Sequence, residues 1–376
     1  MQPLSARLAK VVDAKPVDAF LLTYLPTVRH LSGYFFNFET GPSPFHLLPA
    51  CLVAVPGGEA CLIAADTEGG QLSALVPGIE VKLYASYVCE RPLDFARQFQ
   101  LRLHETIDKY RLSKARLGVE LKALPALVHR ELQRSFPEVV LVDVTAAVER
   151  LRLIKDPEEI ESIRRAVHLC DVGQEELLRA ARPDITELEL FTMVRFAMEQ
   201  EARKRFPMMA DFVSGPRTEE VGGGPSSRII GPGDLILSDL TPCLDGYWGD
   251  TCHTAVAGDP SPLQRTMFQR VKEALNLGIQ ALRPGVKASA IDHVMREHLA
   301  ELGTYSHHSG HGLGVVYHEE PRIVPYNDLE LAPNMVVALE PGLYQDKQGV
   351  RLEHVAAITE DGCEVLSRFQ HRLSAP

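Results

Sequence analysis

Hydrophobic and polar residues alternate with two different periods along the first 150 residues, which indicates a mixture of helices and strands. This mixture predicts a small α/β domain. The sequence of this part contains no phosphate-binding loop, nucleophile elbow or dinucleotide fingerprint. Helical spacing is found at residues 5–13 and 94–110, and short β-rich runs bounded by glycine and proline cover residues 19–23, 51–55 and 60–64.

A helix-start signal near residue 156 indicates a domain boundary. Asp156 is a good N-cap, Pro157 suits the first helical position, and Glu159 stands where the acid of a capping box is expected. The sequence therefore predicts two domains, residues 1–153 and 154–376. In the second domain we expect helices at residues 157–182, 186–203, 262–282 and 288–302, and a long mobile loop at residues 214–227.

Two turns in the second domain are each flanked by apolar runs that carry an acidic residue. Asp239 and Asp250 flank the turn signal at residues 244–246, so in a hairpin they should lie opposite each other within about one residue. Glu340 and Glu353 flank a second turn in the same way. Carboxylates that face each other across a hairpin repel unless a cation lies between them, so the pattern predicts a metal site.

The spacing of these acid pairs indicates an internal duplication. The first acids of the two pairs, Asp239 and Glu340, are 101 residues apart. The helical segments upstream end in Arg-Pro at Arg182 and Arg283, which are also 101 residues apart. Two similar half-domains would then each supply one acid-bearing hairpin, and four carboxylates would converge at a pseudo-twofold centre.

A histidine-rich and glycine-rich stretch at residues 305–321 lies in the same half of the chain. Glycines let the backbone approach neighbouring segments closely, and imidazole is a common ligand for divalent metals. Together with the acid hairpins, this stretch predicts a functional site. Its histidines are His307, His308, His311 and His318, of which we expect His308 at the surface.

Composition limits the possible classes of protein. The 376 residues are 45% hydrophobic and 24% charged, which suits a globular protein with two domains. The apolar runs fall short of the ~18 residues of a spanning helix, and no signal peptide is recognisable, so we expect a cytoplasmic protein with no membrane partner. A net charge of −11 disfavours nucleic acid as a partner. Seven cysteines without a CxxC pair indicate reduced, buried thiols.

The order of these residues closely resembles that of the metallopeptidases with the pita-bread fold, which include prolidases, Xaa-Pro aminopeptidases, methionine aminopeptidases and creatinase relatives. The resemblance covers the whole chain. It implies an α/β (α+β) protein in which a creatinase-like N-terminal domain precedes a pseudo-twofold pita-bread catalytic domain. It is carried by Asp239, Asp250, Gly310-His311-Gly312, His318-Glu319, Glu340-Pro341-Gly342 and Arg351-Leu352-Glu353.

The resemblance also implies the residues of the site. Glu340 would accept the proton of a hydroxide-forming water that bridges the metals, His318 would contact the substrate or its tetrahedral intermediate, and His307 would lie at the pocket wall. Four carboxylates and one imidazole suit manganese, cobalt or zinc. The two divalent ions would be held by Asp239, Asp250, His311, Glu340 and Glu353, with Asp250 and Glu353 bridging them.

Three further residues match positions near the active site in this family. Arg322 stands where prolidases place an arginine near the carboxylate of the dipeptide, and a bidentate pair there would select a free C-terminus. The alternative is a surface arginine that pairs with Glu319 or Glu320. Tyr344 and Arg351 would assist proton transfer and hold the orientation of the ligands.

The chain departs from the family pattern at two positions. The family usually has a histidine 17 residues before the first aspartate, where this chain has Gly222. Losing one donor to the transition state costs about 10²–10³-fold in other enzymes. His253 stands where the family often has arginine.

The sequence therefore predicts a dinuclear Xaa-Pro dipeptidase that acts on small peptides with proline at the second position. One alternative is an Xaa-Pro aminopeptidase that cleaves longer peptides. Another is a catalytically weak or inactive pita-bread binding module, which the missing histidine would suit but which has no need of five intact ligands. The resemblance also implies a homodimer, in which the loop at residues 40–46 of one subunit would gate the pocket of the other.

Overall fold

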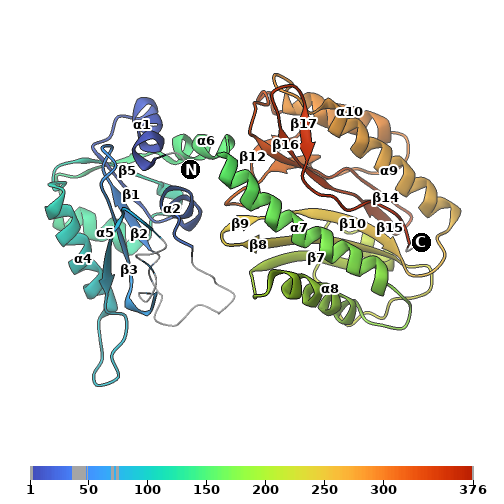
Figure 1. Cartoon of the computed structure of the whole chain (residues 1–376), viewed down its shortest axis with the longest axis horizontal. Helices are drawn as coiled ribbons and strands as arrows, with labels where there is room; N and C mark the ends of the chain where they lie inside the picture. The colour runs from blue at the N-terminus through green and yellow to red at the C-terminus, as the bar shows by residue number, and fades with distance from the viewer. Residues whose placement is uncertain (1–2, 36–47, 49, 69–71, 73–75, 375–376) are drawn as a thin grey trace. The chain divides into compact units, whose positions relative to one another are not determined.

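A computed structural model describes residues 3–35, 48, 50–68, 72 and 76–374. The chain divides into two compact units, Met1–Arg152 and Leu153–Pro376, coloured blue to teal and green to red in Figure 1. The loop expected to gate the pocket, residues 40–46, lies outside the described residues.

The first unit is built on a six-stranded sheet with the strand order β4-β3-β2-β1-β5-β6. Strand β1 pairs antiparallel with β2 and parallel with β5, so the sheet is mixed. Apolar side chains alternate between its two faces, with Phe20 and Leu22 in one core and Ala19 and Leu21 in the other. The helices and strands of this unit are α1 (Leu4–Ala14), β1 (Ala19–Leu22), α2 (Leu25–Ser32), β2 (Cys51–Ala54), β3 (Ala60–Ala65), β4 (Glu80–Tyr84), α4 (Phe95–Lys109), β5 (Arg116–Val119), α5 (Ala126–Ser135), β6 (Val140–Asp143) and α6 (Thr145–Leu153).

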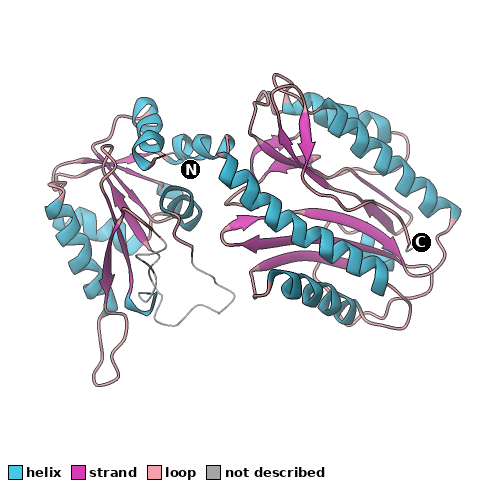
Figure 2. Ribbon diagram, in the orientation of Figure 1, coloured by secondary structure: helices cyan, strands magenta, loops and turns pink. Residues whose placement is uncertain are grey.

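The second unit contains two halves, and each half consists of two helices followed by antiparallel strands, as the predicted duplication requires. Helices lie outside and strands between them (Figure 2). The first half comprises α7 (Pro157–Ala180), α8 (Glu187–Ala202), β7 (Met208–Ser214), β8 (Leu235–Leu244), β9 (Tyr247–Trp248) and β10 (Thr251–Val256). The second comprises α9 (Pro262–Ala281), α10 (Ala288–Leu299), β11 (Gly310–Gly312), β12 (Glu319–Ile323), β13 (Val336–Leu339), β14 (Gly342–Gln345), β15 (Gln348–Arg351), β16 (His354–Ile358) and β17 (Cys363–Val365).

Helix starts in this unit agree with the capping signals in the sequence. Asp156 with Glu159, Thr186 with Glu189, and Ser261 with Gln264 each form a capping box. The predicted loop at residues 214–227 contains a short 3-10 helix at Gly215–Glu219. The buried carboxylate of Glu187 accepts hydrogen bonds from the backbone and hydroxyl groups of Ser214 and Ser226, which ties the two ends of this segment to α8.

The first acid hairpin differs from the prediction in its register. Asp239 pairs with Cys252 rather than with a neighbour of Asp250, so Asp239 and Asp250 are diagonal neighbours across β8 and β10. The reason is the turn. Asp245 and Gly246 both have positive φ (51° and 85°), which places a two-residue turn at these positions, one residue further along the chain than we expected for its centre.

The second acid hairpin has the predicted register. Leu339 pairs with His354 and Gly342 with Arg351, so Glu340 and Glu353 face each other between these pairs. The pseudo-twofold arrangement of acids is therefore present, with a small offset between the halves.

Five of the seven cysteines are buried and all seven are free thiols, but Cys89 is exposed, contrary to the expectation of buried thiols. Among the described residues, no helix has both the length and the apolar character needed to cross a lipid bilayer.

Helix α7 holds the first hairpin at close range. A Cβ atom on Gly249 would lie 2.6 Å from the carbonyl carbon of Ala166 and 2.8 Å from the backbone nitrogen of Val167. Because these are backbone atoms of α7, no side-chain rotation can relieve the clash.

We expect Gly249→Ala to lower the free energy of unfolding by about 1–3 kcal/mol, because helix and hairpin must separate to admit the methyl group. The matched control is Gly224→Ala, since nothing lies within 4 Å of a Cβ atom at Gly224. We expect the control to change stability by less than about 0.5 kcal/mol. Urea denaturation of both variants measures the difference, and equal effects would contradict this view of the packing.

Candidate metal centre

A cavity of about 430 Å³ lies in the second unit. The acid-bearing strands of both halves reach it, and the histidine-rich segment forms part of its wall. Its lining includes all five residues expected to bind metal: Asp239, Asp250, His311, Glu340 and Glu353.

The first half contributes Asp239 on β8 and Asp250, which directly precedes β10. Gln174 of α7 fixes the spacing of these strands, because its amide nitrogen donates to the carbonyl oxygens of Ser238 (3.1 Å) and Thr251 (3.0 Å). Burial raises the pKa of the Asp250 carboxyl well above its ordinary value, and the charge of Asp239 adds to the effect. Thr241 donates a 3.1 Å hydrogen bond to Asp250.

The second half contributes the two glutamates. Burial raises the pKa of Glu340 to about 8, partly offset by Arg351 and reinforced by Asp239. Burial likewise raises the pKa of Glu353, and the charge of Asp250 raises it further. Both carboxylate oxygens of Glu353 are buried and accept no hydrogen bond from the described residues. Such an orphaned carboxylate is costly unless a cation or a proton satisfies it.

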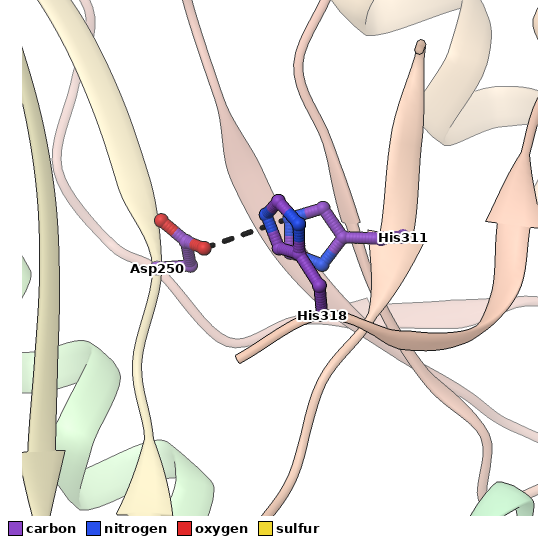
Figure 3. A group of neighbouring side chains, drawn as sticks. All are labelled: Asp250, His311 and His318. Carbon is purple, nitrogen blue, oxygen red and sulfur yellow. Dashed lines mark ion pairs between the residues drawn. The ribbon is translucent and has the colours of Figure 1, made fainter. Parts of the chain in front are cut away.

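His311 lies between the two acid pairs. Its Nδ1 donates to the carbonyl oxygen of Gly312 (3.0 Å), which directs Nε2 to within 3.5 Å of Asp250 and 3.6 Å of Glu340. Burial, reinforced by His318, lowers the pKa of His311 well below its ordinary value. The imidazole is therefore neutral at pH 7, the form that binds metal. Figure 3 shows the rings of His311 and His318 side by side, with Asp250 facing His311.

Three groups of residues in the described part of the chain place possible ligand atoms within 4.8 Å of one another. The groups overlap, since each pair of groups shares at least one residue. They are Asp250-His311-His318, His311-Glu340-Glu353 and Asp239-Asp250-Glu353. Their donors, the orphaned oxygens of Glu353 and the neutral His311 fit divalent cations.

The histidines near the cavity differ in part from expectation. His307 and His318 line it as expected. His308 also lines it, with Nδ1 3.2 Å from Glu340, so the prediction of a surface position for His308 was wrong. The backbone at residues 307–311 turns this ring toward the second acid pair, which spacing alone does not reveal.

The remaining expected residues lie around the cavity wall. The Tyr344 hydroxyl is 2.8 Å from His307 Nε2, and Tyr344 is buried behind that ring rather than among the lining residues. Arg351 lines the cavity and donates to Asp239 at 2.6 Å. Arg322 is not among the lining residues, but its guanidinium lies 3.4 Å from His318 Nδ1. Its backbone nitrogen donates to Glu320.

The histidine segment is anchored by a network that sequence analysis missed. Buried Asp292 on α10 accepts hydrogen bonds from Arg296 Nε at 2.9 Å and from the hydroxyl of Ser309 at 2.5 Å. Arg296 in turn donates to the carbonyl oxygens of Tyr305 (2.7 Å) and His307 (2.5 Å). The sequence could have predicted this ion pair, because Asp292 and Arg296 are four residues apart and therefore lie on the same face of a helix.

The two departures from the family pattern lie in different places. Gly222 is beside the cavity, where its backbone adjoins Asp211. His253 is fully buried and contacts His371, with 2.9 Å between their Nδ1 atoms, and it does not line the cavity.

Comparison with known proteins identifies the family. Residues 161–360 match metallopeptidase family M24, and residues 5–154 match the Creatinase/Prolidase N-terminal domain. The chain belongs to metallopeptidase family M24. It is therefore a metallopeptidase, and both the expected enzyme class and the pita-bread fold with a creatinase N-terminal domain are confirmed.

Individual relatives agree with this assignment. An Xaa-Pro dipeptidase from Pyrococcus furiosus is 34% identical over 234 residues, which are 60% of this chain and 66% of that protein. The prolidase structure from Pyrococcus horikoshii has a TM-score of 0.81 at 25% identity and covers 98% of this chain and 99% of its own. The X-Pro aminopeptidase structure from Thermotoga maritima, at 24% identity, has a TM-score of 0.82 with the same coverage and shows a common fold.

We expect the metal-free protein to lose stability as pH rises from about 7 to about 8.5. A carboxyl whose pKa is raised on folding stabilises the folded state below its ordinary pKa and loses this contribution as pH rises through the folded value, about 8 for Glu340. The pKa of His307 is lowered to about 3 and that of His318 to about 4. These two histidines make the protein more stable as pH rises, but only below about pH 6.5, the ordinary pKa of histidine. Calorimetric Tm values of chelator-treated protein measure the trend.

The control is the same titration with manganese present. Metal ligation replaces the protons of the acids, so the fall in Tm between these pH values should disappear. A metal-free protein that becomes more stable over this range would contradict the assignment of buried, protonated acids.

Proposed function

We propose that this metallopeptidase hydrolyses the Xaa-Pro bond of dipeptides and that two divalent ions occupy its cavity. The observation that carries the proposal is the convergence of two acid pairs on His311, in three overlapping groups of ligand atoms. The five expected ligands do not fall within one of these groups but are divided among them, which supports two ions, with Asp250 and Glu353 as the residues that would be shared.

The donor set supports manganese, cobalt or zinc, because carboxylates and one imidazole favour such ions over thiolate-selected metals. When bound, these ions supply a lowered pKa for water and polarisation of the scissile carbonyl. Glu353 is suited to bridging, because neither of its oxygens has another hydrogen-bond donor among the described residues.

Residues of the chain itself supply the remaining chemistry. Glu340 would accept a proton from the attacking water, as the family resemblance implies, because its carboxylate lines the cavity beside His308 and His311. His318 has a pKa lowered to about 4, mainly by burial, so its neutral ring can donate one hydrogen bond to the substrate. Tyr344 orients His307 through their 2.8 Å hydrogen bond.

An Xaa-Pro aminopeptidase that acts on longer peptides is the second candidate. The position of Arg322 favours it, because its guanidinium lies beside His318 and is not among the groups that line the cavity. An inactive binding module is not favoured, because the full set of ligand residues surrounds the cavity.

We infer a homodimer from the family resemblance; this state and the cytoplasmic location expected from the sequence both stay predictions. The mass of the protein in solution, measured by light scattering, tests the first of them.

We expect chelator-treated protein to be inactive and manganese, cobalt or zinc to restore hydrolysis of Xaa-Pro dipeptides. A panel that compares Ala-Pro with Ala-Pro-Ala decides the substrate length, with Ala-Ala as the control for proline specificity. Faster cleavage of the tripeptide would reassign the enzyme as an aminopeptidase. No hydrolysis with any of the three metals would contradict the proposed function.

We expect Glu340→Gln to lower kcat by at least about 10²-fold, because it removes both a ligand and the proton acceptor. Glu360→Gln is the matched control, since Glu360 is an exposed glutamate of the same half. Steady-state kinetics and metal content are measured together. Retention of full activity by the Glu340 variant would remove Glu340 from the mechanism.

We expect Arg322→Ala to lower kcat/KM for Xaa-Pro by about tenfold or more, because the dipeptidase assignment requires its guanidinium to bind the free C-terminus. The same variant should cleave an Xaa-Pro amide, which has no terminal carboxylate, at the rate of the wild type. Equal losses on both substrates would assign Arg322 to the support of His318 instead.

A further inference from the structure

Asp211 lines the cavity but is not one of the five residues expected to bind metal. It lies on β7 directly opposite Asp239 of β8, and it lines the same cavity. None of the three groups of ligand atoms in the described residues includes it. Its side chain is 36% exposed, compared with 15% for Asp239 and 8% for Glu340. A molecule that enters the cavity therefore meets Asp211 more readily than it meets these two acids.

The charge of Asp211 is only partly neutralised. Arg351 donates hydrogen bonds to both Asp239 (2.6 Å) and Asp211 (3.2 Å). One guanidinium is therefore shared by two carboxylates, and it lies closer to Asp239 than to Asp211. The second oxygen of Asp211 accepts from the backbone N–H of Gly223 at 2.8 Å. These contacts hold the carboxylate in one orientation while a net negative charge stays at the cavity wall.

Gly222 and Asp211 are sterically linked. A Cβ atom on Gly222 would lie 3.0 and 3.1 Å from the two carboxylate oxygens of Asp211, so a side chain at 222 would press on the carboxylate and require it to move by a few tenths of an ångström. The pita-bread enzymes usually carry a histidine at this position. This chain instead presents an anion at the same part of the wall, where an imidazole would present a neutral or positive group.

The surroundings of Asp211 suit a long basic side chain. Met209 lies two residues away on β7 and therefore on the same face of the strand, and Val221 lies on the adjoining loop. Both line the cavity and are 41% and 43% exposed. They offer apolar surface to an aliphatic stem, and the carboxylate offers charge-assisted hydrogen bonds to an ammonium or guanidinium head.

We propose that Asp211, in the space kept open by Gly222, binds a positively charged group at the N-terminal residue of the peptide and thereby selects lysine or arginine before proline. This inference rests on the proposed peptidase function and adds a preferred substrate class to it. The same chemistry would also hold the α-ammonium group of any unblocked peptide, and the experiment separates these two sources.

The test compares Asp211→Asn with the wild type on Lys-Pro and Met-Pro, which have unbranched side chains and differ in charge. Loss of a charge-assisted hydrogen bond lowers affinity by about tenfold or more. We expect the variant to lose about tenfold in kcat/KM on Lys-Pro, through KM, and less than twofold on Met-Pro. An equal loss on both peptides, with metal content unchanged, assigns the bound cation to the α-ammonium group.

Glu219→Gln is the matched control. It makes the same charge change on an exposed residue of the same segment that does not line the cavity, and we expect unchanged selectivity. The proposal is overturned if Asp211→Asn leaves both peptides unaffected, if Glu219→Gln changes selectivity equally, or if the loss follows a loss of bound metal. The last result would mean that Asp211 acts only by holding Arg351.

Calorimetric binding of the same peptides to the metal-loaded proteins separates this inference from the proposed function. If the wild type cleaves neither peptide, the proposed function fails, and the difference in Kd between the wild type and Asp211→Asn still decides the role of Asp211.

A second variant pair tests the steric link. Gly222→His should lower Tm, and Asp211→Ala combined with Gly222→His should restore it and abolish the preference for Lys-Pro. Equal Tm values for these two proteins would contradict the link.

Discussion

The cavity holds more buried acid groups than the protein can ionise without a bound cation. Four carboxyl groups from two hairpins converge on it, and the guanidinium of Arg351 pairs closely with one of them. Removing a carboxylate from water is costly unless a counter-charge or a proton accompanies it, which is why burial raises the pKa of all four acids. A divalent cation that displaces the protons would satisfy these carboxylates, and the rest of the second unit keeps them in place.

The two halves of the pita-bread unit keep the charges at a fixed separation. In the first half, α7 is held to β8 and β10 by Gln174 and by the close contact at Gly249. In the second half, Asp292 and Arg296 of α10 fix the segment that carries the histidines. The acids therefore need little reorganisation when a cation or substrate arrives, which is the condition for electrostatic catalysis.

Local signals in the sequence were sufficient for much of this architecture. Turn residues and the 101-residue spacing predicted both hairpins, and in the second hairpin Glu340 and Glu353 face each other as expected. The first pair is offset because the turn centre depends on the backbone conformation of Asp245 and Gly246. The orientation of His308 and the steric link between Asp211 and Gly222 depend on contacts between distant segments, which periodicity does not encode.

We propose that the four acids and His311 hold two cations in one cavity. Anomalous diffraction at the manganese absorption edge, from crystals grown with manganese, would locate such ions. Two anomalous peaks are expected, both enclosed by Asp239, Asp250, His311, Glu340 and Glu353, with Asp250 and Glu353 in contact with both ions. A single peak, or peaks bound by other residues, would contradict this proposal.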